Sequence, residues 1–136
     1  MNGMKKINLL KIKELVMLQF PVFGQDCNIS HFITTRCGGV GTAACQGLNT
    51  GYFCGDNPDT VRTNRQLLCQ SMGIESDRLF VPYQSHEDNI VKLTEASLFL
   101  DKDARRDLLY GVDALVTDVP GICLGVTTAD CVPVLL

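Results

Sequence analysis

The sequence of 136 residues contains no tryptophan, and aromatic side chains make up only 7% of it. No apolar run reaches the roughly 18–20 residues that a membrane-spanning helix needs. The formal net charge of −3 leaves no excess of positive charge to attract nucleic acid or an anionic membrane. The composition therefore predicts a globular domain that binds neither nucleic acid nor a membrane.

Several common motifs are also missing. The seven cysteines are odd in number and include no CxxC pair, which excludes a zinc ribbon and a thioredoxin-like site. Neither GxGxxG nor GK[ST] occurs, which excludes the dinucleotide-binding fingerprint and the P-loop.

The first 20 residues imitate a signal peptide. Lys11, Lys13 and Glu14 interrupt their apolar stretch, and no small-residue cleavage site follows. We therefore interpret this stretch as an early strand or amphipathic segment, and the protein as cytoplasmic. In that compartment most of the cysteines should be reduced thiols, which behave as small buried hydrophobes.

The rest of the chain is rich in short apolar runs with β-branched residues, which are typical of strands. The predicted strands cover residues 27–36, 79–84, 90–93, 112–117, 122–126 and 132–136. Residues 118–121 predict a type II turn, and residues 94–109 predict a helix or an ordered loop. This pattern predicts an α/β fold, in which a mixed sheet with helices packed outside forms a layered sandwich that is incomplete at its C-terminus.

The clearest helix signal covers Pro58–Met72. Asp56 or Asn57 can cap its start, proline suits its first position, and Gly73 can end it. Its apolar face is predicted to contain Val61, Leu67, Leu68 and Met72.

Asp130 and Cys131 interrupt the apolar C-terminal stretch PGICLGVTTADCVPVLL. If buried strands lie on both sides, a carboxyl group and a thiol are held in an apolar environment. Burying an ionisable group without a partner costs several kcal/mol or forces it into its neutral form. This cost makes Asp130 and Cys131 candidates for a functional site.

The sequence has two histidines, and they receive different interpretations. His31 lies within a predicted strand and is expected to be a hydrogen-bonded structural residue. His86 follows a predicted strand in a polar, accessible segment. Together with Cys131 it could bind zinc, or it could activate the thiol as a nucleophile. Their spacing does not decide between contact and separation.

Arg36 ends a predicted strand and is followed by a turn at Gly38 and Gly39. Its guanidinium and nearby backbone N–H groups could hold a phosphate or carboxylate group. The structural alternative is a salt bridge, for which the candidate partners are Asp56, Asp113 and Asp130.

Motifs that follow one another in the same order resemble the laccase-domain family. They are TTRCGGV at 34–40, GLNTG at 47–51, GDNP at 55–58, QSH at 84–86, DALVT at 113–117 and TADCVPV at 128–134. Members of this family are described as multicopper polyphenol oxidoreductases, and also as purine nucleoside phosphorylases and adenosine deaminases. The resemblance extends over nearly all of the chain from about residue 30.

The resemblance implies a zinc site with His86 and Cys131 as two ligands. The third ligand is a histidine in a His-Ala-Gly-Trp-Arg motif that this sequence does not contain. Residues 1–136 are therefore expected to be the N-terminal portion of a single laccase-like domain, with 1–28 as a family-variable leader. Alternatively, the chain is a truncated product that is catalytically inactive or an oligomer-forming module.

Roles for other side chains are hypotheses within this resemblance. Arg36 and Asn49 are expected to bind substrate, and Arg36 to take part in catalysis by orienting phosphate or a substrate oxygen. Asp130 is expected to take part in catalysis by orienting a metal ligand or by carrying a proton. The implied substrates are purine nucleosides and phosphate, used in phosphorolysis or deamination. Nitrogen and sulfur ligands also accept copper, which leaves a copper-dependent polyphenol oxidoreductase as the enzymatic alternative. The sequence leaves a homo-oligomer open.

Overall fold

The computed structural model describes residues 7–21, 23 and 28–134. The chain divides into two compact units. The N-terminal unit comprises Met1–Thr50 and Asp56–Ser71, and the C-terminal unit comprises Gly51–Gly55 and Met72–Leu136. Among the described residues, no helix combines the length and apolar character needed to cross a bilayer.

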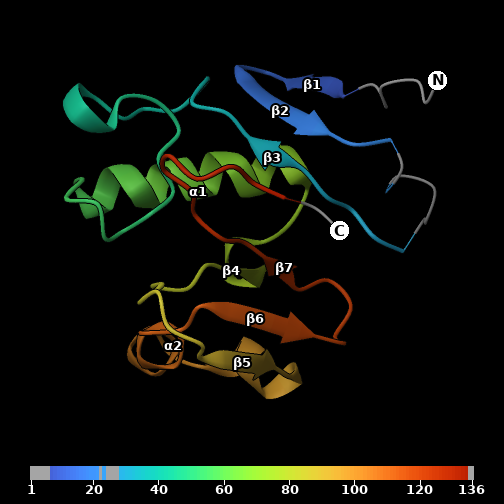
Figure 1. The fold of residues 1–136 in the computed structure, drawn as a ribbon, viewed down its shortest axis with the longest axis vertical. Helices are drawn as coiled ribbons and strands as arrows, with labels where there is room; N and C mark the ends of the chain where they lie inside the picture. The colour runs from blue at the N-terminus through green and yellow to red at the C-terminus, as the bar shows by residue number, and fades with distance from the viewer. Residues whose placement is uncertain (1–6, 22, 24–27, 135–136) are drawn as a thin grey trace. The chain divides into compact units, whose positions relative to one another are not determined.

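A three-stranded antiparallel sheet opens the N-terminal unit (Figure 1). β1 (Asn8–Ile12) and β2 (Leu15–Gln19) form a hairpin, and β3 (Ile33–Thr34) pairs with the other edge of β2. The early strand predicted in the first 20 residues is therefore confirmed. The strand predicted over residues 27–36 is much shorter than expected, and its first residue lies outside the described ranges.

Helix α1 (Pro58–Met72) has the bounds that the sequence predicts. Asn57 caps it, because its Oδ1 accepts a hydrogen bond from the backbone N–H of Asp59 at 2.8 Å. Gly73 follows the helix with φ of +68°, a conformation that glycine adopts without strain. The predicted face is confirmed in part, since the buried helix residues are Val61, Asn64, Leu68 and Cys69.

Asn64 is a polar side chain at the centre of this apolar face, with an exposed fraction of 0%. Its Oδ1 accepts a hydrogen bond from Val40 N at 2.9 Å. Its Nδ2 donates to Gly47 O at 3.1 Å and to Asn49 O at 2.8 Å. The buried amide of Asn64 therefore holds two loops against α1, one at Val40 and one at Gly47 and Asn49.

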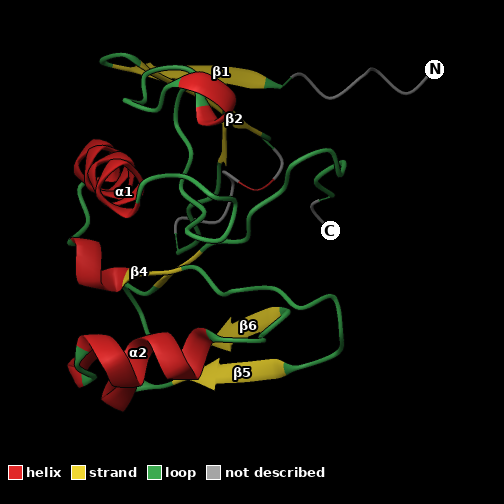
Figure 2. Ribbon diagram, turned by 90° about the vertical axis from the view of Figure 1, so that its left-hand side faces the viewer, coloured by secondary structure: helices red, strands yellow, loops and turns green. Residues whose placement is uncertain are grey.

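Two parallel strand pairs build the C-terminal unit. β4 (Leu79–Phe80) pairs with β7 (Cys123–Leu124), and β5 (Ile90–Leu93) pairs with β6 (Ala114–Thr117). Figure 2 shows β5 and β6 as neighbouring arrows with the same direction, next to helix α2 (Lys102–Leu109). Buried Phe80, Leu93 and Leu109 form the core of this unit.

Short 3-10 helices occupy several connections between these elements. They are η2 (Ala43–Cys45), η3 (Ser76–Arg78) and η4 (Glu95–Phe99). The region 94–109, predicted as a helix or ordered loop, contains η4 and α2. Asp101 caps α2 by accepting a hydrogen bond from Ala104 N at 2.9 Å.

Arg105 extends from α2 over the core of the C-terminal unit. Its guanidinium carbon lies 3.8 Å from the centroid of the Phe80 ring, and its Nη2 donates to Leu79 O at 2.8 Å. Burial lowers the pKa of Arg105, and the negative charge of Asp77 acts in the opposite direction. The pair of contacts joins α2 to β4.

The predicted α/β class with mixed strand pairing is confirmed, but within the described residues the pairing is divided among three small sheets. The predicted type II turn lies one residue later. Ile122 N donates to Val119 O at 3.5 Å, and Gly121 has φ of +79°. That glycine therefore occupies the third turn position, where a positive φ is needed.

Two predictions for the C-terminal stretch are wrong. The strand expected over 122–126 shrinks to β7, and residues 132–134 form no strand. Val132 and Val134 are 82% and 73% exposed, so these described residues are not buried either. Leu135 and Leu136 lie outside the described residues.

The cysteines agree with the sequence prediction only in part. All six that the structure describes are thiols rather than disulfides. Cys69 alone among these six is buried, whereas Cys37, Cys54 and Cys131 are exposed. Most of the described thiols are therefore not the small core hydrophobes that the sequence predicted.

Replacing Asn64 with alanine should destabilise the N-terminal unit. The substitution leaves Val40 N–H and two loop carbonyls without their buried partner, so we expect the free energy of unfolding to fall by about 2–4 kcal/mol. Urea denaturation followed by circular dichroism measures this change. Gln70→Ala, on the exposed side of the same helix, should change it by less than about 0.5 kcal/mol. Equal effects of the two substitutions would contradict the proposed importance of this amide.

Candidate functional site

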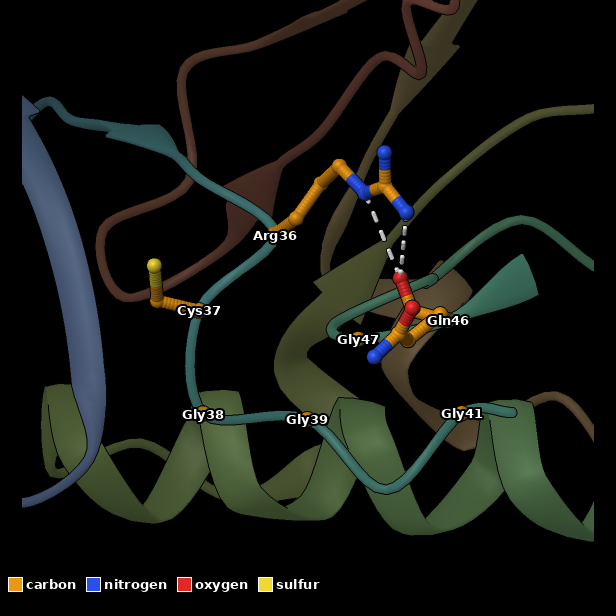
Figure 3. Close-up of a pocket in the computed structure, with 7 residues that line it drawn as sticks. All are labelled: Arg36, Cys37, Gly38, Gly39, Gly41, Gln46 and Gly47. Atoms are coloured by element: carbon orange, nitrogen blue, oxygen red, sulfur yellow. Dashed lines mark hydrogen bonds between the residues drawn. The ribbon is translucent and has the colours of Figure 1, made fainter. Parts of the chain in front are cut away.

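Arg36 lies two residues beyond the end of β3, whereas the sequence predicted it as the last residue of that strand. Thr35 extends the contact with β2, since its N–H and its hydroxyl both donate to Val16 O, at 3.1 and 2.7 Å. Arg36 then turns outward and is exposed. Its Nε and Nη2 donate to the backbone carbonyl of Gln46 at 3.3 and 3.2 Å (Figure 3).

The contacts of Arg36 decide part of the choice between anion binding and a salt bridge that the sequence leaves open. Among the described residues of the N-terminal unit, Arg36 forms no ion pair, so the alternative of a salt bridge to Asp56 is wrong. Two N–H groups of the guanidinium are used on one carbonyl oxygen, and Nη1 has no hydrogen bond within the described part of the chain. The guanidinium is therefore oriented, and still has donors to offer.

Two glycine-containing loops meet at this arginine. Gly41 and Gly47 form an antiparallel bridge with two hydrogen bonds of 3.1 Å. A Cβ atom at Gly39 would overlap with the backbone of Gly47, and a Cβ atom at Gly47 would overlap with the carbonyl of Arg36. The two loops therefore approach each other more closely than side chains allow.

An open pocket of about 380 Å³ lies between these loops, with α1 beneath them (Figure 3). Its lining consists of Arg36, Cys37, Gly38, Gly39, Gly41, Gln46 and Gly47. Four of these seven residues are glycines, which offer only main chain to the pocket, and Arg36 supplies its positive charge. In Figure 3 the Cys37 thiol points away from the arginine guanidinium.

Asn49 occupies a structural position next to this loop pair. Its Nδ2 donates to Asp56 Oδ2 at 2.8 Å, and its backbone carbonyl accepts the bond from Asn64. These contacts fix the loop that leads to α1. Binding of substrate by Asn49 stays a prediction.

His86 lies in the C-terminal unit, in the turn between β4 and β5, and is exposed. Its backbone has φ of +63°. The carboxylate of Asp113 accepts hydrogen bonds from His86 N at 2.7 Å, Glu87 N at 2.9 Å and Ser85 Oγ at 3.2 Å. One carboxylate therefore holds three consecutive residues of the histidine turn.

The same contacts shift the titration of Asp113. Loss of hydration acts to raise the pKa of this carboxyl group, but the hydrogen bonds from Glu87, His86 and Ser85 together outweigh it, and the pKa is lowered. Asp113 is therefore ionised at neutral pH, and both of its oxygens can act as acceptors.

Asp130 and Cys131 are both exposed, which corrects the prediction that they are buried between two strands. The nearest strand before them, β7, ends at Leu124, and the described residues that follow them form no strand. The cost of burying an ionisable group therefore does not apply here. The described residues contain no group of three or more histidine, cysteine or acidic side chains arranged to hold a metal ion.

Gln84 links the two segments that carry the predicted ligands. Its Oε1 accepts hydrogen bonds from the N–H and the hydroxyl of Thr127, at 3.2 and 3.3 Å. Gln84 is two residues before His86, and Thr127 is four residues before Cys131. His31, by contrast, is structural as predicted, because its Nε2 accepts a hydrogen bond from Phe20 N at 2.9 Å.

Sequence reasoning assigned no role to Gln84 or Asn64, and it considered Asp113 only as a possible salt-bridge partner of Arg36. Gln84 and Asp113 were otherwise recognised only as residues of the QSH and DALVT motifs. Each is a polar side chain at a strand end or on an apolar helix face, where an unpartnered group is costly. That position is the signal that could have identified them.

Gly39→Ala tests whether the two loops need main-chain contact. Because the new Cβ atom would overlap with backbone atoms, we expect the free energy of unfolding to fall by about 3 kcal/mol or more. Gly73→Ala is the control, since its Cβ atom meets open space and only its positive φ is strained, at about 1 kcal/mol. Thermal and urea unfolding of both variants measure the difference, and a loss at Gly39 no larger than at Gly73 would contradict the overlap.

Comparison with known proteins agrees with the sequence motifs. A model of the family described as multi-copper polyphenol oxidoreductase laccase matches residues 30–136. A purine nucleoside phosphorylase from Bacteroides thetaiotaomicron is 40% identical over 124 residues, which are 91% of this chain and 46% of that protein. Adenosine deaminase RL5, from an unknown prokaryotic organism, is 39% identical over 108 residues, or 79% of this chain and 41% of that protein.

Solved structures share the fold. A hypothetical protein YfiH from Bacillus licheniformis superposes with a TM-score of 0.75 at 28% identity, over 89% of this chain and 44% of that one. YlmD from Geobacillus stearothermophilus gives a TM-score of 0.71 at 25% identity, over 90% of this chain and 44% of that one. The chain thus spans less than half the length of these relatives. Since the family match covers most of its residues, the chain belongs to the multi-copper polyphenol oxidoreductase laccase family.

Proposed function

We propose that this protein acts on purine nucleosides and cleaves their glycosidic bond with phosphate, with deamination of adenosine as a second activity. The names of its relatives, purine nucleoside phosphorylase and adenosine deaminase, support this class of substrate. The observation that carries the proposal in this chain is the contact of Gln84 with Thr127, because it joins the segments that carry His86 and Cys131.

His86 and Cys131 are proposed as two ligands of a zinc ion. An imidazole nitrogen and a thiolate sulfur are both common zinc ligands, and both residues are exposed. A third ligand has to come from outside the described residues, which contain no complete group of three. Zinc that is held by three protein ligands keeps one position open and acts there as a Lewis acid on a water molecule or a substrate oxygen.

The pocket at Arg36 is proposed to bind an oxyanion, either phosphate or a substrate oxygen. A guanidinium binds phosphate oxygens through charge-assisted hydrogen bonds, which are about twice as strong as neutral ones. Gln46 O holds Nε and Nη2 on one side, so the remaining N–H groups are presented in a fixed direction. The glycine loops leave room for a ligand to approach the main chain.

Phosphorolysis then proceeds by substitution at the anomeric carbon of the ribose. A phosphate oxygen forms the new bond while the bond to the purine nitrogen breaks, and the purine leaves with the electron pair and takes up a proton. Arg36 offsets the charge of the phosphate. Asp130, an exposed carboxylate next to Cys131, is proposed to carry the proton. In deamination, water replaces the amino group of the purine and ammonia leaves.

Zinc content tests the proposed ligands. Wild-type protein should bind one zinc ion per site, and His86→Ala or Cys131→Ser should reduce the zinc content measured by atomic emission. Cys54→Ser and His31→Gln are matched controls that remove the same chemical groups elsewhere, and they should retain zinc. Equal zinc content in all four variants would exclude His86 and Cys131 as ligands.

Arg36→Ala tests the oxyanion pocket. Loss of one charge-assisted contact should lower kcat/KM for phosphate about 10- to 100-fold in inosine phosphorolysis, with a smaller loss for Arg36→Lys. Arg62→Ala, which removes an exposed arginine of α1, should leave the phosphate dependence unchanged. An unchanged phosphate dependence in Arg36→Ala would contradict the pocket's role.

The copper-dependent alternative follows from the description of the family, and the metal itself separates the two. Protein depleted of metal is reloaded with zinc alone or with copper alone. Recovery of nucleoside cleavage with zinc supports the proposal. Recovery of polyphenol oxidation with copper, without nucleoside cleavage in either sample, would replace it by the oxidoreductase.

A further inference from the structure

The backbone of His86 adopts a left-handed conformation, with φ of +63°. Such a conformation costs an L-residue with a Cβ atom about 1–2 kcal/mol. Residues in strained conformations persist where surrounding contacts determine them, and they cluster at functional sites. The contacts that hold His86 in this state are therefore informative.

Asp113 supplies these contacts. The two successive backbone N–H groups of His86 and Glu87 point to its two carboxylate oxygens, at 2.7 and 2.9 Å. Successive N–H groups next to a left-handed residue form a concave anion-binding nest. The anion in this nest is a side chain of the protein itself.

The parallel pairing of β5 and β6 explains why Asp113 is available. Both strands begin at the same end of their sheet, so the turn before β5 and the residues before β6 lie together. Asn89 O accepts hydrogen bonds from the N–H groups of Asp113 and Ala114, at 2.9 and 3.1 Å. Asn89 Nδ2 donates to Gly111 O at 2.9 Å. The histidine turn is thus fastened to the start of β6 at several points.

We propose that Asp113 is a positioning residue for metal binding: by holding the backbone of residues 86 and 87, it fixes the direction in which the His86 imidazole is presented. This inference rests on the proposed function, in which His86 is a zinc ligand. Asp113 acts through the main chain of the ligand residue, and its oxygens need not touch the imidazole or the ion. Loss of its second acceptor oxygen should therefore weaken binding without removing a ligand.

The test measures the zinc affinity of Asp113→Asn by competition with a chromophoric chelator at neutral pH. Asparagine keeps the shape of the side chain but offers an N–H₂ group where Glu87 N–H needs an acceptor. We expect zinc affinity to fall about 10- to 100-fold, the range typical of residues that orient metal ligands. Asp113→Glu, which keeps the charge and both oxygens, should recover part of the loss.

Asp118→Asn is the matched control. It removes a carboxylate just after the other end of β6, which pairs with Lys92 Nζ at 2.8 Å. The change in charge is the same, but no contact with residues 85–87 is lost, so zinc affinity should change by less than about twofold. If Asp113→Asn and Asp118→Asn bind zinc equally well, the positioning role is wrong.

A cobalt spectrum separates positioning from general stability. At saturating Co²⁺, Asp113→Asn should show ligand-field bands shifted from those of wild-type protein, because the imidazole approaches from a different direction. A variant that only folds less well would give weaker bands at unchanged wavelengths, and that result would overturn the inference. If His86→Ala leaves zinc affinity unchanged, the proposed function falls as well. If His86→Ala weakens zinc binding and Asp113→Asn does not, the inference alone falls.

Discussion

The N-terminal unit depends on one buried amide. Asn64 has no exposed surface, yet its oxygen and nitrogen are matched to Val40 N, Gly47 O and Asn49 O. Burying an unpaired amide would be unfavourable, so only the arrangement that brings all three groups to the helix is stable. That arrangement also sets the two loops at the separation that forms the pocket of Arg36.

In the C-terminal unit, a charged side chain, the carboxylate of Asp113, fixes a loop in the same way. Asp113 satisfies the N–H groups of the turn that carries His86, and Gln84 satisfies the N–H of Thr127 in the segment that leads to Cys131. In both units, side chains with several acceptor or donor atoms fix loops that have little regular structure. Such loops keep a defined conformation without being buried, which suits residues that have to meet a ligand.

Local signals in the sequence were sufficient for some elements and not for others. Pro58–Met72 was predicted with its bounds because caps and apolar spacing lie within the helix itself, and Ile90–Leu93 because it is a short β-branched run. Residues 132–134 have the same apolar character but no described strand pairs with them, and an apolar run becomes a strand only when a neighbour completes its hydrogen bonds. The roles of Asn64 and Asp113 depend on contacts between distant segments, which spacing along the chain does not encode.

The partner of Arg36 is a backbone carbonyl rather than the side chain of Gln46. Any residue at position 46 would offer the same oxygen, so the direction of the guanidinium does not depend on which amino acid is encoded there. At Gly39 and Gly47, by contrast, the identity of the residue matters, because a Cβ atom at either position would overlap with neighbouring backbone. The chemical character of the pocket rim at position 46 can therefore change without removing the acceptor of Arg36, whereas the main-chain wall at positions 39 and 47 leaves no room for a side chain.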